Sequence, residues 1–329
     1  MLKKGLKIVT IGGGTGTFTL LSGLKKYTSN LTAVVSMADS GGSTGRLRDE
    51  FGILPPGDVR RALIALSSGS EQLLLRQLFE YRFENGSKGS SLNGHSFGNL
   101  FLTALNGIFN DQVKAIQEAG RLLDIKGEVL PVTLTDTHLV ARLEDGTLIR
   151  GETNIDIRLV YPNLKILDVF LDPPAEACKS VLQAIRRADL IVIGPGDLYT
   201  SIIPNLLVKG VSEAIAKTRG KVIYVCNIMN KHGETDSFTA SRYVKEIQSY
   251  LGSPAGKRSY IDKVLVNEGR YPKRLLTKYA EEKAYPVEID ISELEDLVPS
   301  VRIVDCTVKG SLMRHDSNKL GRAILIGNG

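Results

Sequence analysis

The chain has 329 residues and a formal net charge of +6, with 42% hydrophobic and 24% charged residues. This size is compatible with one large α/β domain or two smaller ones, and the composition is that of a globular protein with an apolar core. No apolar run approaches the roughly 20 residues that span a bilayer, and the first residues lack a signal-peptide pattern. We therefore expect a cytoplasmic protein without a membrane span.

The net charge indicates which ligands the chain favours, and the cysteine spacing indicates whether disulfides or a zinc site are expected. The positive charge favours anionic ligands such as nucleotides and sugar phosphates. Basic residues are mostly interleaved with acids, and no helix-turn-helix, zinc-finger or RNA-binding aromatic pattern is present, so we expect no nucleic-acid partner. Cys178, Cys226 and Cys306 are widely spaced, which favours buried free thiols over disulfides or a zinc site.

Short apolar runs alternate with helix-like segments along most of the chain. We expect strands at residues 7–11, 31–36, 166–170, 190–193, 222–226 and 264–266. We expect helices at residues 17–26, 59–66, 71–81, 97–109, 111–122, 175–187, 211–218 and 238–251. This alternation predicts an α/β fold with a Rossmann-like, doubly wound, mostly parallel sheet.

The middle of the chain interrupts this alternation. Residues 129–134, 138–143 and 147–150 have the pattern of short strands, with a hairpin turn at residues 144–146. We interpret residues 126–165 as a small β insertion. Because the α/β pattern resumes afterwards, we expect residues 1–329 to form a single nucleotide-binding domain.

A glycine-rich loop directly follows the first predicted strand. Its glycines permit a sharp turn and a close approach to a ligand, and the next helix would point free N–H groups at a phosphate. The loop matches neither the dinucleotide fingerprint, because Thr17 stands at the third glycine position, nor the Walker pattern. The candidate phosphate-binding residues are Gly12, Gly13, Gly14, Thr15, Gly16 and Thr17. The alternative is a tight turn without a ligand.

A second polar loop follows the second predicted strand. Its amides and hydroxyls suit phosphate oxygens, and Arg46 or Arg48 could hold a phosphate through two parallel hydrogen bonds. Asp39 could bind Mg²⁺ or a ribose hydroxyl. The candidate binding residues are Asp39, Ser40, Gly41, Gly42, Ser43, Thr44 and Arg46. A flexible polar loop is the alternative.

Two further segments contain polar residues beside predicted helices. Asp58 follows Pro55-Pro56-Gly57 and could cap the next helix, bind a metal or take part in catalysis. His95 precedes an apolar helix, and a lone histidine is more often structural than catalytic. Asn99 lies one turn inside that helix and is a candidate binding residue.

A third strand-end loop begins with a Gly-Pro-Gly turn. Gly194, Pro195, Gly196 and Tyr199 are candidate binding residues in a second anion-binding turn. Asn227 ends a later strand in the same manner, and Arg314 could bind an anion. Ligands of open α/β sheets bind beyond the carboxyl ends of the strands. We therefore expect these loops to form one large cleft that suits a diphosphate nucleotide.

Taken together and in this order, the segments resemble the gluconeogenesis factor family of bacteria, which is related to 2-phospho-L-lactate transferase. The resemblance covers essentially the whole chain. It rests on residues 12–16, 39–48, 55–60, 94–100 and 194–205. It implies a Rossmann-like core, binding of a nucleotide sugar such as UDP-N-acetylglucosamine, and a role in gluconeogenic growth and cell shape.

The resemblance also bears on single residues. In the transferase branch, acids matching Asp39 and Asp58 are expected near metal or phosphate. Asp197 departs from the family pattern, in which serine is expected at that position, and an acid there would repel phosphate. Tyr271 could stack on a uracil or close the cleft.

Three functions are compatible with these features. The first is a nucleotide-sugar-binding regulator that requires no cofactor and acts through a protein partner in cell-wall synthesis. The second is a Mg²⁺-dependent transferase acting on a phosphorylated small acid and a nucleotide, with Asp39 and Asp58 as metal ligands. The third is an NAD-dependent oxidoreductase, which lacks an obvious hydride-transfer residue, although adventitious binding of NAD or another nucleotide stays open. Whether the chain catalyses a reaction or forms a homo-oligomer, and the roles of Asp197 and His95, also stay open.

Overall fold

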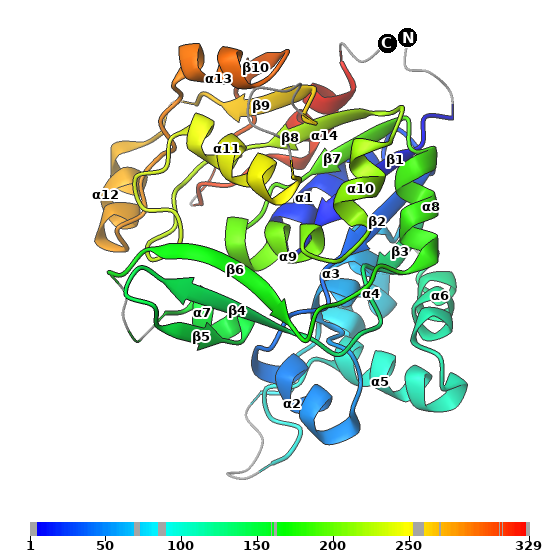
Figure 1. Ribbon diagram of the computed structural model, residues 1–329. Coiled ribbons are helices and arrows are strands. Elements are labelled where there is room, and N and C mark those ends of the chain that lie inside the picture. The colour runs from blue at the N-terminus through cyan, green and yellow to red at the C-terminus, as the bar shows by residue number, and fades with distance from the viewer. Residues whose placement is uncertain are drawn as a thin grey trace.

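A computed structural model of the chain describes residues 5–68, 73–84, 90–158, 160, 163–252, 260–269, 271–308, 310 and 312–326. Within these residues a large sheet has the strand order β10-β9-β8-β7-β1-β2-β3, and all its pairings are parallel (Figure 1). Its strands are β1 (Ile8–Gly12), β2 (Leu31–Val35), β3 (Glu128–Pro131), β7 (Leu190–Ile193), β8 (Lys221–Val225), β9 (Lys263–Asn267) and β10 (Val301–Val304). The doubly wound α/β prediction is confirmed.

The strand order reverses between β1 and β7. From β1 the chain proceeds outward to β2 and β3 on one side, and then returns to β7 and continues to β8, β9 and β10 on the other. Crossovers that diverge in this way leave a crevice at the carboxyl ends of the two central strands. The loops after β1 and β7 border this switch point.

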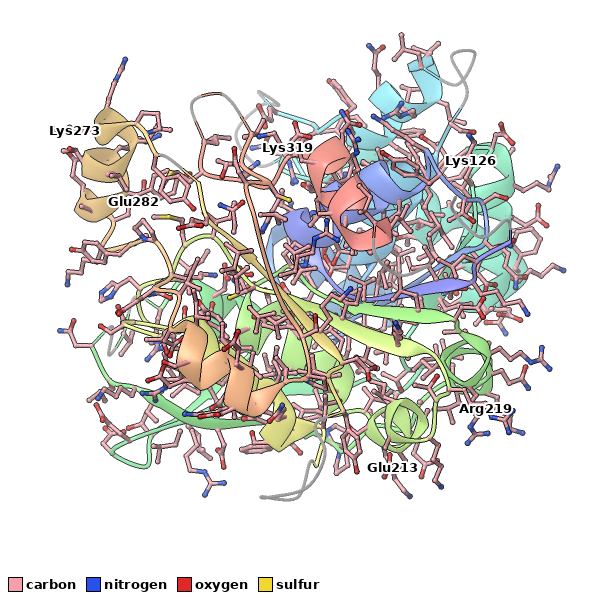
Figure 2. All side chains as sticks on the ribbon, turned by 90° about the horizontal axis from the view of Figure 1, so that it is seen from above. Lys126, Glu213, Arg219, Lys273, Glu282 and Lys319 are labelled. Atoms are coloured by element: carbon pink, nitrogen blue, oxygen red, sulfur yellow. The ribbon has the colours of Figure 1, made fainter. Side chains whose placement is uncertain are left out.

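Helices cover both faces of the large sheet. Those of the first half are α1 (Gly14–Leu24), α2 (Gly42–Phe51), α3 (Gly57–Leu66), α4 (Leu73–Glu80), α5 (Phe97–Phe109), α6 (Gln112–Leu122) and α7 (Glu152–Asp156). Those of the second half are α8 (Lys179–Arg187), α9 (Ile203–Leu206), α10 (Val211–Ala216), α11 (Ala240–Tyr250), α12 (Lys273–Glu281), α13 (Ile291–Leu297) and α14 (Ser317–Leu325), with a π-helical turn at Leu198–Ile202. In Figure 2, α14 with Lys319 lies on one side of the strands and α10 with Glu213 on the other.

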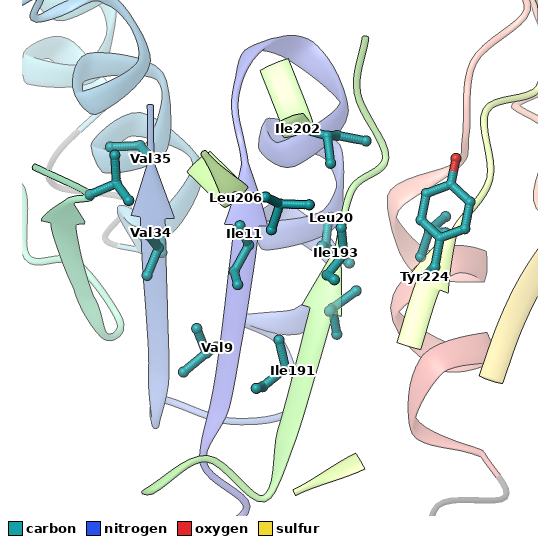
Figure 3. Packing of buried hydrophobic residues seen from close by; sticks show 14 of the residues in the cluster. Val9, Ile11, Leu20, Val34, Val35, Ile191, Ile193, Ile202, Leu206 and Tyr224 are labelled. Atoms are coloured by element: carbon teal, nitrogen blue, oxygen red, sulfur yellow. The ribbon is translucent and has the colours of Figure 1, made fainter. Parts of the chain in front are cut away.

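The core lies between the sheet and these helices. Val9 and Ile11 of β1 pack beside Ile191 and Ile193 of β7, and all four side chains are buried (Figure 3). Central parallel strands are covered on both faces, which explains why their sequences are almost continuously apolar. On one face, α1 packs against α14 so closely that Gly23 leaves no room for a Cβ beside the Ser317 carbonyl.

A small antiparallel sheet forms an arm beside the large one. It comprises β5 (Leu148–Arg150), β4 (His138–Leu143) and β6 (Ile166–Asp172), with α7 between β5 and β6 in the chain. The predicted insertion at residues 126–165 therefore has different bounds. The strand at its start, β3, pairs with β2 in the large sheet, and β6 pairs with β4 rather than joining the large sheet.

Residues 84–91, which are rich in glycine and serine and therefore favour a loop, lie mostly outside the described residues. Among the helices that are described, none combines the length and the apolar character required to cross a bilayer.

Candidate functional site

A cleft of about 550 Å³ lies at the switch point, at the carboxyl ends of the central strands. The loops after β1, β2 and β7 all contribute to it, as the sequence predicts. The predicted residues that line it are Gly13, Gly14, Thr15, Gly16, Asp39, Gly41, Gly42, Ser43, Thr44, Asp58, Asn99, Gly196 and Arg314. Asp197, whose role the sequence left open, lines it as well.

Three helices begin at this cleft. The first residues of α1, α2 and α3 are Gly14, Gly42 and Gly57, and each lines the cleft. The free N–H groups and the positive dipole ends of such helices favour an anion. The start of α2 differs from the sequence prediction of a polar loop here, because glycine and hydroxyl residues favour loops.

Asp58 caps a helix, but not the one predicted. It lies in the first turn of α3, whose N-cap is Pro56, and its Oδ1 accepts a hydrogen bond of 2.9 Å from the N–H of Gly14, the first residue of α1. A Cβ at Gly13 would collide with the same carboxylate, so the glycine is needed there for close packing.

The electrostatics of Asp58 reflect a second carboxylate. Burial and the charge of Asp39 raise the pKa of Asp58 to about 6, although Arg61, at 3.6 Å, opposes the shift. Asp39 accepts a hydrogen bond of 2.9 Å from the N–H of Gly41, and its Oδ2 leaves no room for a Cβ at Gly57. Paired carboxylates of this kind either hold a proton or attract a cation.

The arm supplies a wall of the cleft that no sequence motif predicts. Glu152, Thr153, Asp156 and Ile157 line the cleft from α7 and its end, and the Thr153 N–H donates to Ser40 Oγ at 3.2 Å. Burial and the charges of Asp39, Asp156 and Asp58 raise the pKa of Glu152 to about 8. No motif spacing identifies these residues, because only the packing of the small sheet brings them to the cleft.

Arginines balance part of this acidity. Arg60, Arg61, Arg82 and Arg314 line the cleft. Arg60 is buried, and burial lowers its pKa to about 10, which leaves it charged at neutral pH. Of these four, only Arg314 is predicted from the sequence as a binding residue.

Asn99 holds Arg60 in place within a buried network. Its Oδ1 accepts from Arg60 Nε at 3.0 Å, and its Nδ2 donates to Ser43 Oγ at 3.2 Å. His95 Nδ1 lies 3.0 Å from the same Ser43 oxygen, and burial lowers the pKa of His95. His95 thus packs behind the cleft as a neutral, hydrogen-bonded side chain.

A smaller lobe of about 180 Å³ adjoins the cleft. The two share Thr15, Gly16, Gly196, Asp197 and Arg314. The predicted residues Pro195 and Asn227 line the lobe together with Met229, Met313 and His315, and Asn227 Oδ1 accepts from the Gly196 N–H at 3.2 Å. The site therefore combines a polar cleft with a lobe that is partly apolar.

Several predicted residues do not line either space. Gly12 and Gly194 lie at the base of their turns, where positive φ at Gly194 favours glycine, and Ser40 holds α7. Thr17 is buried, with its Oγ1 packed below Gly12. Tyr199 is buried in the core, and its hydroxyl donates to Glu246 at 2.9 Å.

The three remaining predicted residues are held by neighbours outside the cleft. Arg46 donates to the Asn93 carbonyl at 2.7 Å, and Arg48 donates to the Thr137 carbonyl at 2.8 Å. The Tyr271 hydroxyl accepts from Asn267 Nδ2 at 2.8 Å. Hydrogen-bond partners that a sequence motif does not reveal account for the positions of these three side chains.

A Rossmann-like α/β protein with a polar cleft at its switch point is thus the class that fold and site define. Residues 8–307 match the family described as 2-phospho-L-lactate transferase CofD. The chain belongs to this family.

Close relatives carry the name gluconeogenesis factor. The protein of that name from Halalkalibacterium halodurans is 42% identical, over 97% of this chain and 96% of its own length. The one from Bacillus subtilis is 41% identical, over 97% of both chains. A crystal structure of a Bacillus halodurans protein superposes with a TM-score of 0.89 at 41% identity, covering 97% of this chain and 99% of that one. The predicted family resemblance is confirmed.

Proposed function

We propose that the chain binds a nucleotide sugar of the UDP-N-acetylglucosamine type in the cleft and the adjoining lobe. Through this binding it would support growth on gluconeogenic carbon sources and regulate cell shape, by contact with a protein of cell-wall synthesis. The family membership and the names of the relatives support the gluconeogenic part of this proposal.

One observation carries the ligand class: three helix N-termini and Arg60, Arg61, Arg82 and Arg314 converge on a single cleft. Backbone N–H groups and guanidinium groups are the donors that proteins use for phosphate. The adjoining lobe, with Met229, Met313 and the Asn227 amide, offers a planar base both apolar contact and a hydrogen-bond partner.

Isothermal titration calorimetry tests this proposal directly. We expect UDP-N-acetylglucosamine to bind, and free N-acetylglucosamine to bind far more weakly because it lacks the uridine diphosphate group. Arg314→Ala removes a guanidinium shared by cleft and lobe and should weaken binding. Arg322→Ala removes an exposed guanidinium of α14 and is the matched control. Absence of binding up to millimolar ligand would refute the proposal.

The Asp39–Asp58 pair favours a second candidate function, a Mg²⁺-dependent transferase. Two carboxylates, one with its pKa raised partly by the other, suit a hard divalent cation with oxygen ligands. Asp39 and Asp58 would hold the ion, which would neutralise phosphate charge during transfer. If Asp39→Asn and Asp58→Asn abolish function in cells but leave nucleotide affinity intact, the transferase is favoured. If the variants lose cellular function and nucleotide affinity to the same extent, the nucleotide-sugar-binding regulator is favoured.

A further inference from the structure

Lys231 lies at the centre of a cluster of carboxylates from three separate segments. Its Nζ pairs with Asp156 at the end of α7, with Asp197 of the β7 loop at 2.9 Å, and with Glu234 at 2.9 Å. Among the described residues these three acids form a group whose oxygens lie close enough to hold one cation. The lysine ammonium supplies that positive charge.

The loop after β8 holds Lys231 in this position. The Lys231 N–H donates to Thr235 Oγ1 at 3.0 Å, and the Lys231 carbonyl accepts from the Thr235 N–H at 2.9 Å. The Tyr243 hydroxyl lies 2.8 Å from Thr235 Oγ1 and braces the turn from α11. Because backbone and side-chain contacts fix the loop, the ammonium has a defined place.

The three acids differ in exposure, and this difference orients the cluster. Glu234 is almost fully buried, with 1% of its side chain exposed, whereas 42% of Asp197 and 30% of Asp156 are exposed. Asp156 and Asp197 line the cleft, but Lys231 does not. The Lys231 side chain is 29% exposed and its ammonium lies beside the lining of the cleft, between buried Glu234 and the two aspartates that face the ligand space.

An unpaired aspartate at that wall would oppose binding of phosphate. Like charges repel over several ångströms, and a cation at hydrogen-bond distance offsets part of that field. The charges of Glu234, Asp197 and Asp156 raise the pKa of Lys231 despite its burial, so the ammonium stays protonated.

We propose that Lys231 is a positioning residue that offsets part of the negative charge of Asp156 and Asp197 and thereby lets the cleft accept a diphosphate. This inference rests on the proposed function in one respect, namely that the ligand carries phosphate. It explains how an acid at Asp197, which would otherwise repel phosphate, is compatible with the cleft.

The test measures the affinity of the full chain for UDP-N-acetylglucosamine and for inorganic pyrophosphate. Lys231→Met should weaken binding of both by about tenfold. Adding Asp197→Asn to Lys231→Met should restore most of the affinity, because it removes the charge that Lys231 neutralises. The loss in Lys231→Met should also shrink at high salt, since repulsion is screened. Lys209→Met breaks an exposed ion pair with Glu176 outside the cleft and should change neither affinity.

The outcomes separate this role from others. Unchanged affinity in Lys231→Met overturns the proposal. A loss of affinity that Asp197→Asn fails to restore also overturns it, because that result indicates a direct phosphate contact or a purely structural role for Lys231. If Lys231→Met does not fold, Asp197→Asn alone decides: equal or tighter binding supports the proposal and weaker binding overturns it.

A wild type that binds pyrophosphate but not UDP-N-acetylglucosamine contradicts the proposed function, and the effect of Lys231→Met is then measured on the affinity for pyrophosphate. Binding of neither ligand overturns both.

Discussion

The cleft brings together three carboxylates, those of Asp39, Asp58 and Glu152, and the charge of Asp39 raises the pKa of the other two. Among the described residues, fewer cationic side chains than carboxylates contact this group. The Glu152 carboxyl is the extreme case, because burial and three neighbouring acids raise its pKa to about 8. Protein stability then depends on pH. A raised carboxyl pKa favours the folded state below the unfolded pKa, and this contribution is lost as the pH rises through the folded pKa.

The unfolding free energy should therefore fall between about pH 4.5 and pH 8. Glu152→Gln removes the ionisable group and should make the variant more stable than the wild type by about 3 kcal/mol above pH 8, with little difference near pH 4.5. Urea denaturation at a series of pH values measures this. Glu295→Gln changes an exposed glutamate of α13 and is the control. A constant difference across the pH range would contradict the prediction.

Gly16 is required because the first turn of α1 packs against the β7 loop. A Cβ at this position would collide with the Pro195 carbonyl oxygen, which is backbone and cannot rotate away. Gly16→Ala should cost about 1–3 kcal/mol of stability and weaken ligand binding. Gly107→Ala, in an exposed turn of α5 with open space around it, should be neutral or stabilising by up to about 1 kcal/mol. Thermal unfolding compares the two, and equal effects would show that the close approach does not matter.

At the scale of elements, the N-terminal turns of α2, α3 and α5 are joined through Asn99. Asn99→Ala removes the acceptor of the buried Arg60 guanidinium and the donor to Ser43. Leaving a buried charged group with one partner fewer should cost about 2–4 kcal/mol, and ligand affinity should fall because Arg60 is no longer oriented. Asn106→Ala on the same helix controls for the change in side-chain type. Chemical denaturation and calorimetry check both effects; an affinity unchanged by Asn99→Ala would rule out the orienting role.

Elements with strong local signals were predictable. The helix at Phe97–Phe109 has the expected bounds because Ser96 caps it and its apolar residues recur with helical spacing, and the strand Leu190–Ile193 is equally clear. The helix at Gly42–Phe51 was not predicted, since glycine and hydroxyl residues favour loops. Sheet membership of β3 and β6 depends on pairing between distant segments, which a single sequence does not contain.

The same limit applies to the candidate site. Strand-end loops such as residues 12–17 and 39–46 could be placed at one edge because parallel strands share a direction. Three other features of the site could not be predicted, because each joins segments far apart in the chain. These are the contribution of α7, the capping of α1 by Asp58 and the pairing of Lys231 with Asp197. Packing of the whole fold determines them.

At the scale of the whole molecule, ligand binding should stabilise the fold, because the cleft is built from both halves of the sheet. Saturation at about 100 times Kd adds about 2.7 kcal/mol, which for a chain of this length corresponds to an increase in Tm of about 4 °C. A thermal shift assay with UDP-N-acetylglucosamine measures this. Free N-acetylglucosamine at the same concentration should leave Tm nearly unchanged, and an equal shift from both would show that the uridine diphosphate group is not what is recognised.

The packing of α14 on α1 has a consequence for biosynthesis. The glycine loop at residues 12–16 leaves the ribosome well before Arg314 and α14, the helix that supports α1, because these lie far downstream in the chain. The first strand and its loop are therefore exposed on the nascent polypeptide until Arg314 and α14 have been translated. Only then can the cleft become competent, so chaperone contacts with the emerging amino-terminal third would fall within that interval.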